Sequence, residues 1–182
     1  MRKLILQTGV SIDGYVAALD GSHPWGVDDR EDDGVKRWIL ESVSAAGAHL
    51  MGRVTYEEMA SVWPTSTSDY ARPMNEIPKV VFSKTLRHAD WPETSIARGD
   101  LGEEIDRLKR EPGGDLIAYG GATFDQALSR LGLVDEYRLM IQPAALGAGL
   151  ALFKGLPTPL QLELVEATTY PTGIAIHVYR PR

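Results

Sequence analysis

Two glycines, Gly120 and Gly121, stand where an apolar segment gives way to a helical one. Residues 116–119 before them have the character of a buried strand, and Thr123 with Gln126 has the spacing of a helix-capping box. Because glycine lacks a Cβ atom, a ligand can approach this backbone closely, and the helix behind it presents its positive end. The pattern predicts a seat for a phosphate group, although such turns also join strands to helices where no ligand binds.

A second junction of the same kind lies at Gly52. Arg53 follows it directly, and Thr55 with Glu58 again has capping-box spacing. A glycine, a cation and a helix N-terminus therefore converge at one place, which suits a diphosphate. Because Arg53 stands four residues before Glu57, an ordinary surface ion pair is the other interpretation of this residue.

A third junction ends the apolar residues 79–82 with Ser83 and Lys84, whose hydroxyl and ammonium groups can hold a phosphate monoester. All three junctions are expected at strand carboxyl ends, and in open α/β sheets the ligand lies beyond those ends. One dinucleotide can therefore span the three sites.

Composition narrows the classes of protein and of function. The 182 residues suffice for one domain, and the absence of cysteine excludes disulfides, thiol catalysis and cysteine-ligated zinc. The net charge of −6, with acidic residues gathered in 28–33, gives no nucleic-acid footprint. No apolar run approaches the ~20 residues of a membrane span, so we expect a cytoplasmic protein without membrane contact. The histidines share no metal-ligand spacing, so no metal is predicted.

The order of elements predicts a single α/β domain over residues 1–182. Strands are expected near 3–10, just before Gly52, and at 79–83 and 115–119. Helices are expected at about 34–46, from Thr55, after Asp100 and up to about Leu131. Residues 63–77 lack periodicity and are expected to be a long loop. Strands near 135–142, 160–169 and 173–179 follow, the last two as an antiparallel hairpin. These elements predict a mixed, mostly parallel sheet with helices on both faces.

Several segments, taken together, resemble the dihydrofolate reductase superfamily, and within it the C-terminal reductase domain of the bifunctional riboflavin-biosynthesis deaminase-reductases. They are residues 11–17, 51–57, 119–123 and 133–136, followed by Pro143, residues 146–149 and residues 152–153. The resemblance covers nearly the whole chain and rests on the order and spacing of these motifs. It implies a dihydrofolate reductase-like three-layer fold that binds NADPH across the sheet, often as a homodimer. Because zinc deaminase chemistry needs cysteine ligands and the sequence has none, we expect a free-standing reductase domain without the deaminase partner.

The resemblance also implies a set of cofactor residues. Those expected at the diphosphate and its ribose are Gly52, Arg53, Val54 and Thr55. Those expected on the other side of the diphosphate are Gly120, Gly121, Ala122 and Thr123, with a cis peptide between the glycines. Ser83 and Lys84 are expected at the 2′-phosphate, which favours NADPH over NADH. Those expected near the nicotinamide are Thr8, Gly9, Val16 and Ala17.

The implied reaction is hydride transfer to a C=N or C=O carbon of a small heterocycle. The substrate is expected to be pterin- or folate-like, or like 5-amino-6-(5-phosphoribosylamino)uracil. A ribose phosphate calls for cations, and those near the expected pocket in sequence are Arg30, Lys36 and Arg37.

Dihydrofolate reductases deliver the proton from a carboxylate at the start of the first helix. Asp33 occupies about that place, where an aspartate is also an ordinary N-cap. The prediction is therefore an NADPH-dependent reductase with Asp33 as its catalytic residue. The alternative is a non-catalytic dinucleotide-binding or dimerisation module that retains the fold. A hydrolase finds no supporting motif.

Overall fold

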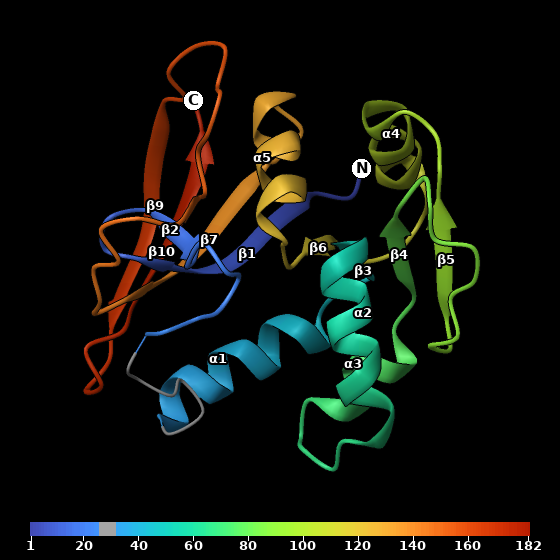
Figure 1. Cartoon of the computed structure of the whole chain (residues 1–182), viewed down its shortest axis with the longest axis horizontal. Coiled ribbons are helices and arrows are strands. Elements are labelled where there is room, and N and C mark those ends of the chain that lie inside the picture. Colours follow the sequence, from blue (N-terminus) through green and yellow to red (C-terminus); the bar gives the residue numbers. More distant parts are fainter. Residues whose placement is uncertain (26–31) are drawn as a thin grey trace.

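The computed structural model describes residues 1–25 and 32–182, and its central element is an eight-stranded sheet (Figure 1). The strand order is β5-β4-β3-β6-β1-β7-β10-β9. The strands are β1 (Leu4–Ser11), β3 (Ala48–Gly52), β4 (Lys79–Phe82), β5 (Thr94–Ala97), β6 (Leu116–Ala118), β7 (Glu136–Gln142), β9 (Leu162–Thr169) and β10 (Ala175–Pro181). From β5 to β7 all neighbours are parallel, whereas β10 and β9 are added antiparallel. The mixed, mostly parallel sheet with its C-terminal hairpin is therefore confirmed.

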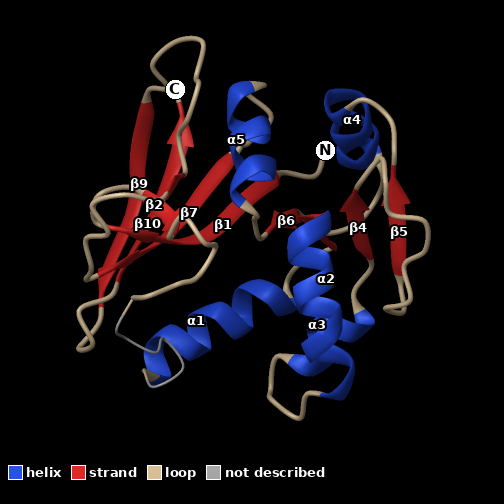
Figure 2. Cartoon of the chain, in the orientation of Figure 1, coloured by secondary structure: helices blue, strands red, loops and turns tan. Residues whose placement is uncertain are grey.

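Helices cover both faces of this sheet, which gives the expected three layers (Figure 2). They are α1 (Asp33–Ser44), α2 (Arg53–Val62), α3 (Ala71–Glu76), α4 (Leu101–Arg110) and α5 (Ala122–Arg130). Leu50 of β3 packs in the same apolar cluster as Ile105 of α4 and Leu128 of α5. The next residue, Met51, packs with Val43 of α1 instead. Successive side chains of a strand point to opposite faces of the sheet. A central parallel strand therefore contributes apolar side chains to the packing of both helical layers.

The segment 63–77 is more ordered than its sequence predicts. It contains a 3₁₀ turn at Trp63–Thr65 and the short helix α3. The buried ammonium of Lys79 donates hydrogen bonds of 3.0, 2.9 and 2.8 Å to the carbonyls of Met74, Asn75 and Ile77 at the end of α3. The prediction of a long loop is wrong. The carbonyl groups at the end of α3 receive hydrogen bonds from a residue on the next strand, and the periodicity of residues 63–77 cannot indicate such a contact.

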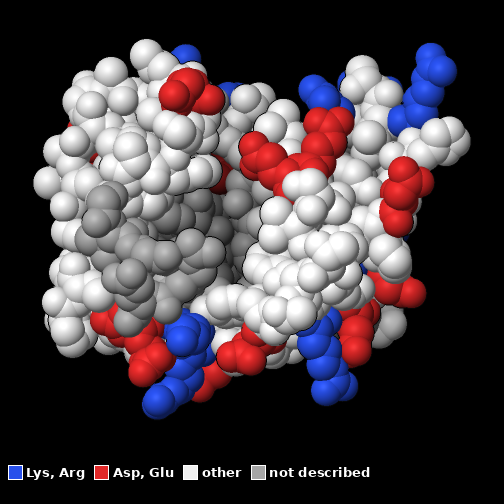
Figure 3. All heavy atoms as spheres, turned by 60° about the horizontal axis from the view of Figure 1, so that its bottom comes forward, with Lys and Arg blue, Asp and Glu red and all other residues white. Residues whose placement is uncertain are grey.

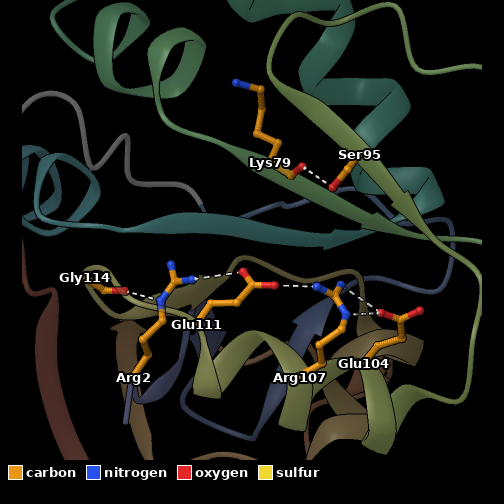
Figure 4. Close-up of polar contacts among 7 residues, drawn as sticks. All are labelled: Arg2, Lys79, Ser95, Glu104, Arg107, Glu111 and Gly114. Atoms are coloured by element: carbon orange, nitrogen blue, oxygen red, sulfur yellow. Dashed lines mark hydrogen bonds and ion pairs between the residues drawn. The ribbon is translucent and has the colours of Figure 1, made fainter.

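Charged side chains hold α4 to the start of the chain (Figure 4). Arg2 donates to the carbonyl of Gly114 and lies 3.8 Å from a carboxylate oxygen of Glu111. Glu111 also pairs with Arg107, which in turn binds Glu104 at 2.9 Å. On the neighbouring strands, Ser95 Oγ donates to the Lys79 carbonyl at 3.3 Å. These contacts fix the α4 side of the sheet, away from the strand ends where a ligand is expected.

The outer strand β9 leaves part of its apolar surface uncovered. Leu162 packs partly against the core, but Leu164 and Val165 are 52 % and 45 % exposed. The homodimer implied by the family resemblance stays a prediction, and this strand is a surface that a second copy can cover. None of the helices in residues 1–25 and 32–182 has the length and apolar character that crossing a bilayer requires.

A short second sheet joins two motifs that lie far apart in the sequence. Its strands are β2 (Tyr15–Ala17) and β8 (Leu150–Ala151). Asp13 accepts hydrogen bonds from the amides of Leu146 and Gly147, at 3.1 and 2.7 Å, and from the Ser11 hydroxyl. The Ser11 hydroxyl and these amides hold the pKa of the Asp13 carboxyl below its ordinary value. Asp13 thereby ties the segment after β1 to the segment before β8.

Gly149 has no room for a side chain, because an added Cβ would overlap the backbone oxygen of Ala17. We expect Gly149→Ala to lower the free energy of unfolding, measured in urea, by about 1–3 kcal/mol. Gly102→Ala in the first turn of α4 is the matched control, since the nearest atom is a side-chain oxygen of Asp100 at 3.2 Å. Equal unfolding free energies for the two variants would contradict the close approach of β2 and β8.

Candidate functional site

Two strand-to-helix junctions lie side by side because β3 and β6 are parallel neighbours. The Gly52 amide donates to the Gly120 carbonyl at 3.3 Å, so the two turns touch through their backbones. A Cβ on Gly52 would lie 3.3 Å from Phe124 Cβ, and one on Gly121 would lie 3.4 Å from Thr55 Oγ1. The first two predicted phosphate seats therefore form one surface, and glycine allows them to approach.

The glycine pair itself has the geometry that the family resemblance implies. The peptide bond between Gly120 and Gly121 is cis. Gly120 has a φ of 106°, a value that L side chains rarely adopt. A larger residue at this position would be strained by its backbone conformation alone.

Neither helix at these junctions is capped by a side chain. The N-cap residues are Gly52 for α2 and Gly121 for α5. The predicted capping boxes are wrong, because Thr55 and Thr123 lie inside the first turn and Gln126 donates to the backbone of β8 instead. The helices begin at the glycines, so their first-turn N–H groups receive no side-chain oxygen from the described residues. These groups are left to bind an anion.

A cavity of about 460 Å³ opens in front of the two turns. The predicted cofactor residues that line it are Thr8, Val16, Ala17, Gly52, Arg53, Val54, Thr55, Gly120, Gly121, Ala122 and Thr123. The structure thus brings together residues from β1, β2 and both glycine junctions. Figure 3 shows a hollow near the middle of one face, where most of the described atoms at its edge are neither basic nor acidic.

Three predicted cofactor residues do not line this cavity. Gly9 faces a second, adjoining cavity. Ser83 and Lys84 follow β4, whose last residue pairs with Gly52, so they lie beyond the same sheet edge. However, the Ser83 hydroxyl accepts hydrogen bonds from the backbone of its own turn, and Lys84 is exposed. Their expected contact with a 2′-phosphate stays a prediction.

Arg53 lines the cavity and also forms the surface pair that its sequence position allows. Its guanidinium donates two hydrogen bonds to the Glu57 carboxylate, at 3.0 and 2.9 Å, and both side chains are about half exposed. Such exposed pairs contribute little to stability. A ligand phosphate can therefore exchange with Glu57 at modest cost.

Asp33 does not reach the cavity. The N-cap of α1 is Asp32, whose Oδ1 accepts from the amides of Gly34 and Val35 at 2.9 and 3.2 Å. The Asp33 side chain is 90 % exposed and pairs with Lys36. Because the cap lies one residue earlier than the sequence suggested, Asp33 points to solvent, and this geometry speaks against its assignment as the proton donor. The acidic residues Asp28, Asp29 and Glu31 lie outside the described part of the chain.

The buried carboxyl group at the cavity is Asp125 of α5, which the sequence analysis did not single out. It is fully buried and lines the cavity, and neither carboxyl oxygen has a hydrogen-bond partner among the described residues. Burial raises the pKa of Asp125 well above its ordinary value. A neutral carboxylic acid at this place can both donate and accept a hydrogen bond. In sequence an acidic residue in a first helical turn resembles a surface residue, so only its burial reveals it.

We expect the stability of the protein to depend on Asp125 in a pH-dependent way. The unfolded carboxyl ionises near about pH 4, whereas the folded one stays protonated to higher pH. Its favourable contribution is therefore complete below about pH 4 and is lost as pH rises through the folded pKa. Asp125→Asn should be more stable than the parent at about pH 8, by about 1–3 kcal/mol in urea unfolding.

The same difference should shrink as pH falls toward about pH 4. Asp69→Asn, at an exposed aspartate, is the matched control and should show no such trend. A difference between Asp125→Asn and the parent that stays constant with pH would show that this carboxyl is ionised in the folded protein.

A second cavity of about 440 Å³ adjoins the first. The residues that line both are Thr8, Val16, His23, Met59 and Tyr119. The Tyr119 hydroxyl lies 3.0 Å from Nδ1 of His49, whose Nε2 lies 3.2 Å from the Pro73 carbonyl. Burial lowers the pKa of His49 to about 4 and raises that of Tyr119, so this pair is uncharged near neutral pH. Among the described residues, no group of three or more His, Asp or Glu side chains is placed to hold a metal ion.

The sequence profile of the RibD C-terminal domain family matches residues 2–176. The protein belongs to the RibD C-terminal domain family. It is 29 % identical to the uncharacterized protein YyaP of Bacillus subtilis, over 98 % of this chain and 94 % of YyaP. Membership of this family supports an oxidoreductase function.

Solved structures of low sequence identity share the fold of this RibD C-terminal domain. A riboflavin biosynthesis protein from Shewanella sp. PV-4 superposes with a TM-score of 0.78 at 21 % identity, over 99 % of each chain. Dihydrofolate reductase from Enterococcus faecalis superposes with a TM-score of 0.69 at 13 % identity, over 99 % of this chain and 96 % of that one. The dihydrofolate reductase-like fold expected from the sequence is confirmed.

Proposed function

We propose that this RibD C-terminal domain protein is an NADPH-dependent reductase of a small heterocyclic substrate. The observation that carries the proposal is the pair of uncapped helix N-termini, those of α2 and α5, that face one cavity. Two such ends, held together by the Gly52–Gly120 contact, match the two phosphates of a dinucleotide. The 460 Å³ cavity continues past them to β1, where a nicotinamide ring can lie.

The residues fit the cofactor in separate roles. Gly52, Gly120 and Gly121 let the diphosphate approach the backbone, while Thr8 and Val16 line the region between the two cavities. When bound, NADPH supplies a hydride from its reduced nicotinamide to a C=N or C=O carbon, and a proton completes the reduction at the heteroatom. The protein orients the two rings and excludes water at the junction of the cavities.

The choice of NADPH over NADH belongs to this proposal. Its supports are the E. faecalis dihydrofolate reductase, whose structure is a complex with NADP(H), and the position of Ser83 and Lys84 beyond the same sheet edge as Gly52. A non-catalytic dinucleotide-binding module is the second candidate, because the exposed position of Asp33 removes the expected proton donor. The two candidates differ in one measurement, since only a reductase oxidises bound NADPH when an acceptor is added.

Arg53→Ala is expected to weaken NADPH binding by about 1–3 kcal/mol, because it removes a charge-assisted bond to phosphate at the end of β3. Fluorescence titration with NADPH and, separately, with NADH measures both the loss and the preference. Saturable binding of the parent protein that favours NADPH is the expected result.

Arg72→Ala is the matched control for this titration. Arg72 forms the same kind of pair, four residues before Glu76 on α3, but does not line either cavity. Its removal should leave NADPH affinity unchanged. If Arg53→Ala and Arg72→Ala behave alike, Arg53 only holds Glu57. If the parent protein binds neither nucleotide, the reductase proposal fails.

A further inference from the structure

The second cavity is the natural place for the hydride acceptor, provided that the proposed reductase function holds. It shares Thr8, Val16 and Tyr119 with the cofactor cavity, so a ring bound there can lie against a nicotinamide in the first cavity. Its volume of about 440 Å³ suits a bicyclic or tricyclic ring system. The residues that line this cavity therefore indicate the shape, charge and hydrogen-bonding groups of the substrate.

The described walls of this cavity are aromatic and apolar. The rings that line it are Trp25, Trp63, Tyr70 and Tyr119. None of its described lining residues is Lys, Arg, Asp or Glu. Flat walls of this kind favour a planar ligand. A phosphate group would lose its hydration there without a cation in return.

Lys36 and Arg37, two of the three cations that lie near the expected pocket in sequence, do not line the cavity. Lys36 pairs with Asp33 at 3.3 Å, and Arg37 is exposed on α1. Neither lines the cavity, and Arg30 lies outside the described residues. Arg138 does not line the cavity; it contacts Glu136 at 2.9 Å, and Arg180 shares this carboxylate at 3.1 Å.

Two glutamine amides supply the polar part of the wall. Gln142 is 2 % exposed, and its Oε1 has no hydrogen-bond partner among the described residues. Gln7 Oε1 accepts from the Ser42 hydroxyl at 2.6 Å, which leaves the NH₂ group of Gln7 to a ligand. Ser42 is held in turn by Arg138 at 2.9 Å. Both glutamines thus line the same cavity, one with its amide oxygen held by Ser42 and one with an amide oxygen that has no partner among the described residues.

Gly9 leaves space beside these groups. A Cβ at this position would lie 3.8 Å from Nε2 of Gln142 and 3.8 Å from Nε1 of Trp25. Gln142 therefore offers both an acceptor and a donor next to an open stretch of β1. A cyclic amide edge, with N–H next to C=O, is the group that pairs with both atoms of a carboxamide.

We infer that this cavity binds an uncharged planar heterocycle through its cyclic amide edge, that Gln142 reads this edge, and that the substrate carries no phosphate. A substrate without phosphate differs from the 5-amino-6-(5-phosphoribosylamino)uracil-like alternative and is compatible with the pterin- or folate-like one. Its supports are the unpartnered buried Oε1 of Gln142 and the lack of Lys, Arg, Asp and Glu among the described lining residues.

The test uses fluorescent probes in the presence of saturating NADP⁺. Lumichrome, riboflavin and riboflavin 5′-phosphate share a planar ring system with a cyclic amide edge, and the last two differ only in the phosphate. We expect lumichrome and riboflavin to bind saturably, and the phosphate to weaken binding about 10-fold or more. Equal or tighter binding of riboflavin 5′-phosphate would overturn the exclusion of phosphate.

Gln142→Leu removes both polar atoms at similar side-chain size. It should weaken riboflavin binding about 10-fold or more, whereas Gln161→Leu, at an exposed glutamine, should leave it unchanged. 3-Methylriboflavin lacks the ring N–H, so it should bind the parent more weakly than riboflavin does and bind Gln142→Leu as well as riboflavin does. If the methyl group lowers affinity equally in the parent and in Gln142→Leu, Gln142 does not bind the ring N–H and its proposed role is wrong.

NADPH titration of Gln142→Leu shows whether the variant is folded, because the first cavity does not contain this residue. Unchanged NADPH affinity is expected. If none of the three probes binds while NADPH does, the inferred substrate class is wrong and the reductase proposal stands. If NADPH itself fails to bind the parent protein, the proposed function fails first.

Discussion

The contact between two neighbouring strand ends is the constraint on which the site depends. Because β3 and β6 run parallel and the Gly52 amide bonds to the Gly120 carbonyl, α2 and α5 must begin next to each other. A Cβ atom at Gly52 or Gly121 would lie only 3.3 Å from Phe124 or 3.4 Å from Thr55. The same glycines that permit this approach leave both helices without side-chain caps, so the capacity to bind an anion arises from backbone groups.

The buried ionisable side chains around this surface have shifted pKa values or ion-pair partners. Burial raises the pKa of Asp125 well above its ordinary value, and His49 with Tyr119, which lines both cavities, forms a pair that is uncharged near neutral pH. Arg138 lines neither cavity and shares the Glu136 carboxylate with Arg180. The site therefore separates two electrostatic tasks: helix ends for a charged cofactor, and neutral amides and rings for its partner. Proposed hydride transfer between the two requires such a dry junction.

The sequence predicted the parallel strands, the terminal hairpin and the glycine junctions, because period-two burial and strand-turn-helix spacing are local properties. It missed β5 and the helix α3. The end of α3 depends on Lys79, which lies on the following strand and satisfies three carbonyl groups. It also placed the cap of α1 at Asp33 instead of Asp32, since two adjacent aspartates are equivalent in a local pattern.

For the candidate site, the sequence by itself determined which glycines can meet a ligand, since backbone freedom at Gly52, Gly120 and Gly121 is intrinsic to the residue. Tertiary structure decided which residues share a cavity. Asp125 and Gln142 became candidates because packing around them removes water and leaves polar atoms unpartnered among the described residues. Burial of this kind is set by segments distant in sequence, and therefore no local pattern of residues specifies it.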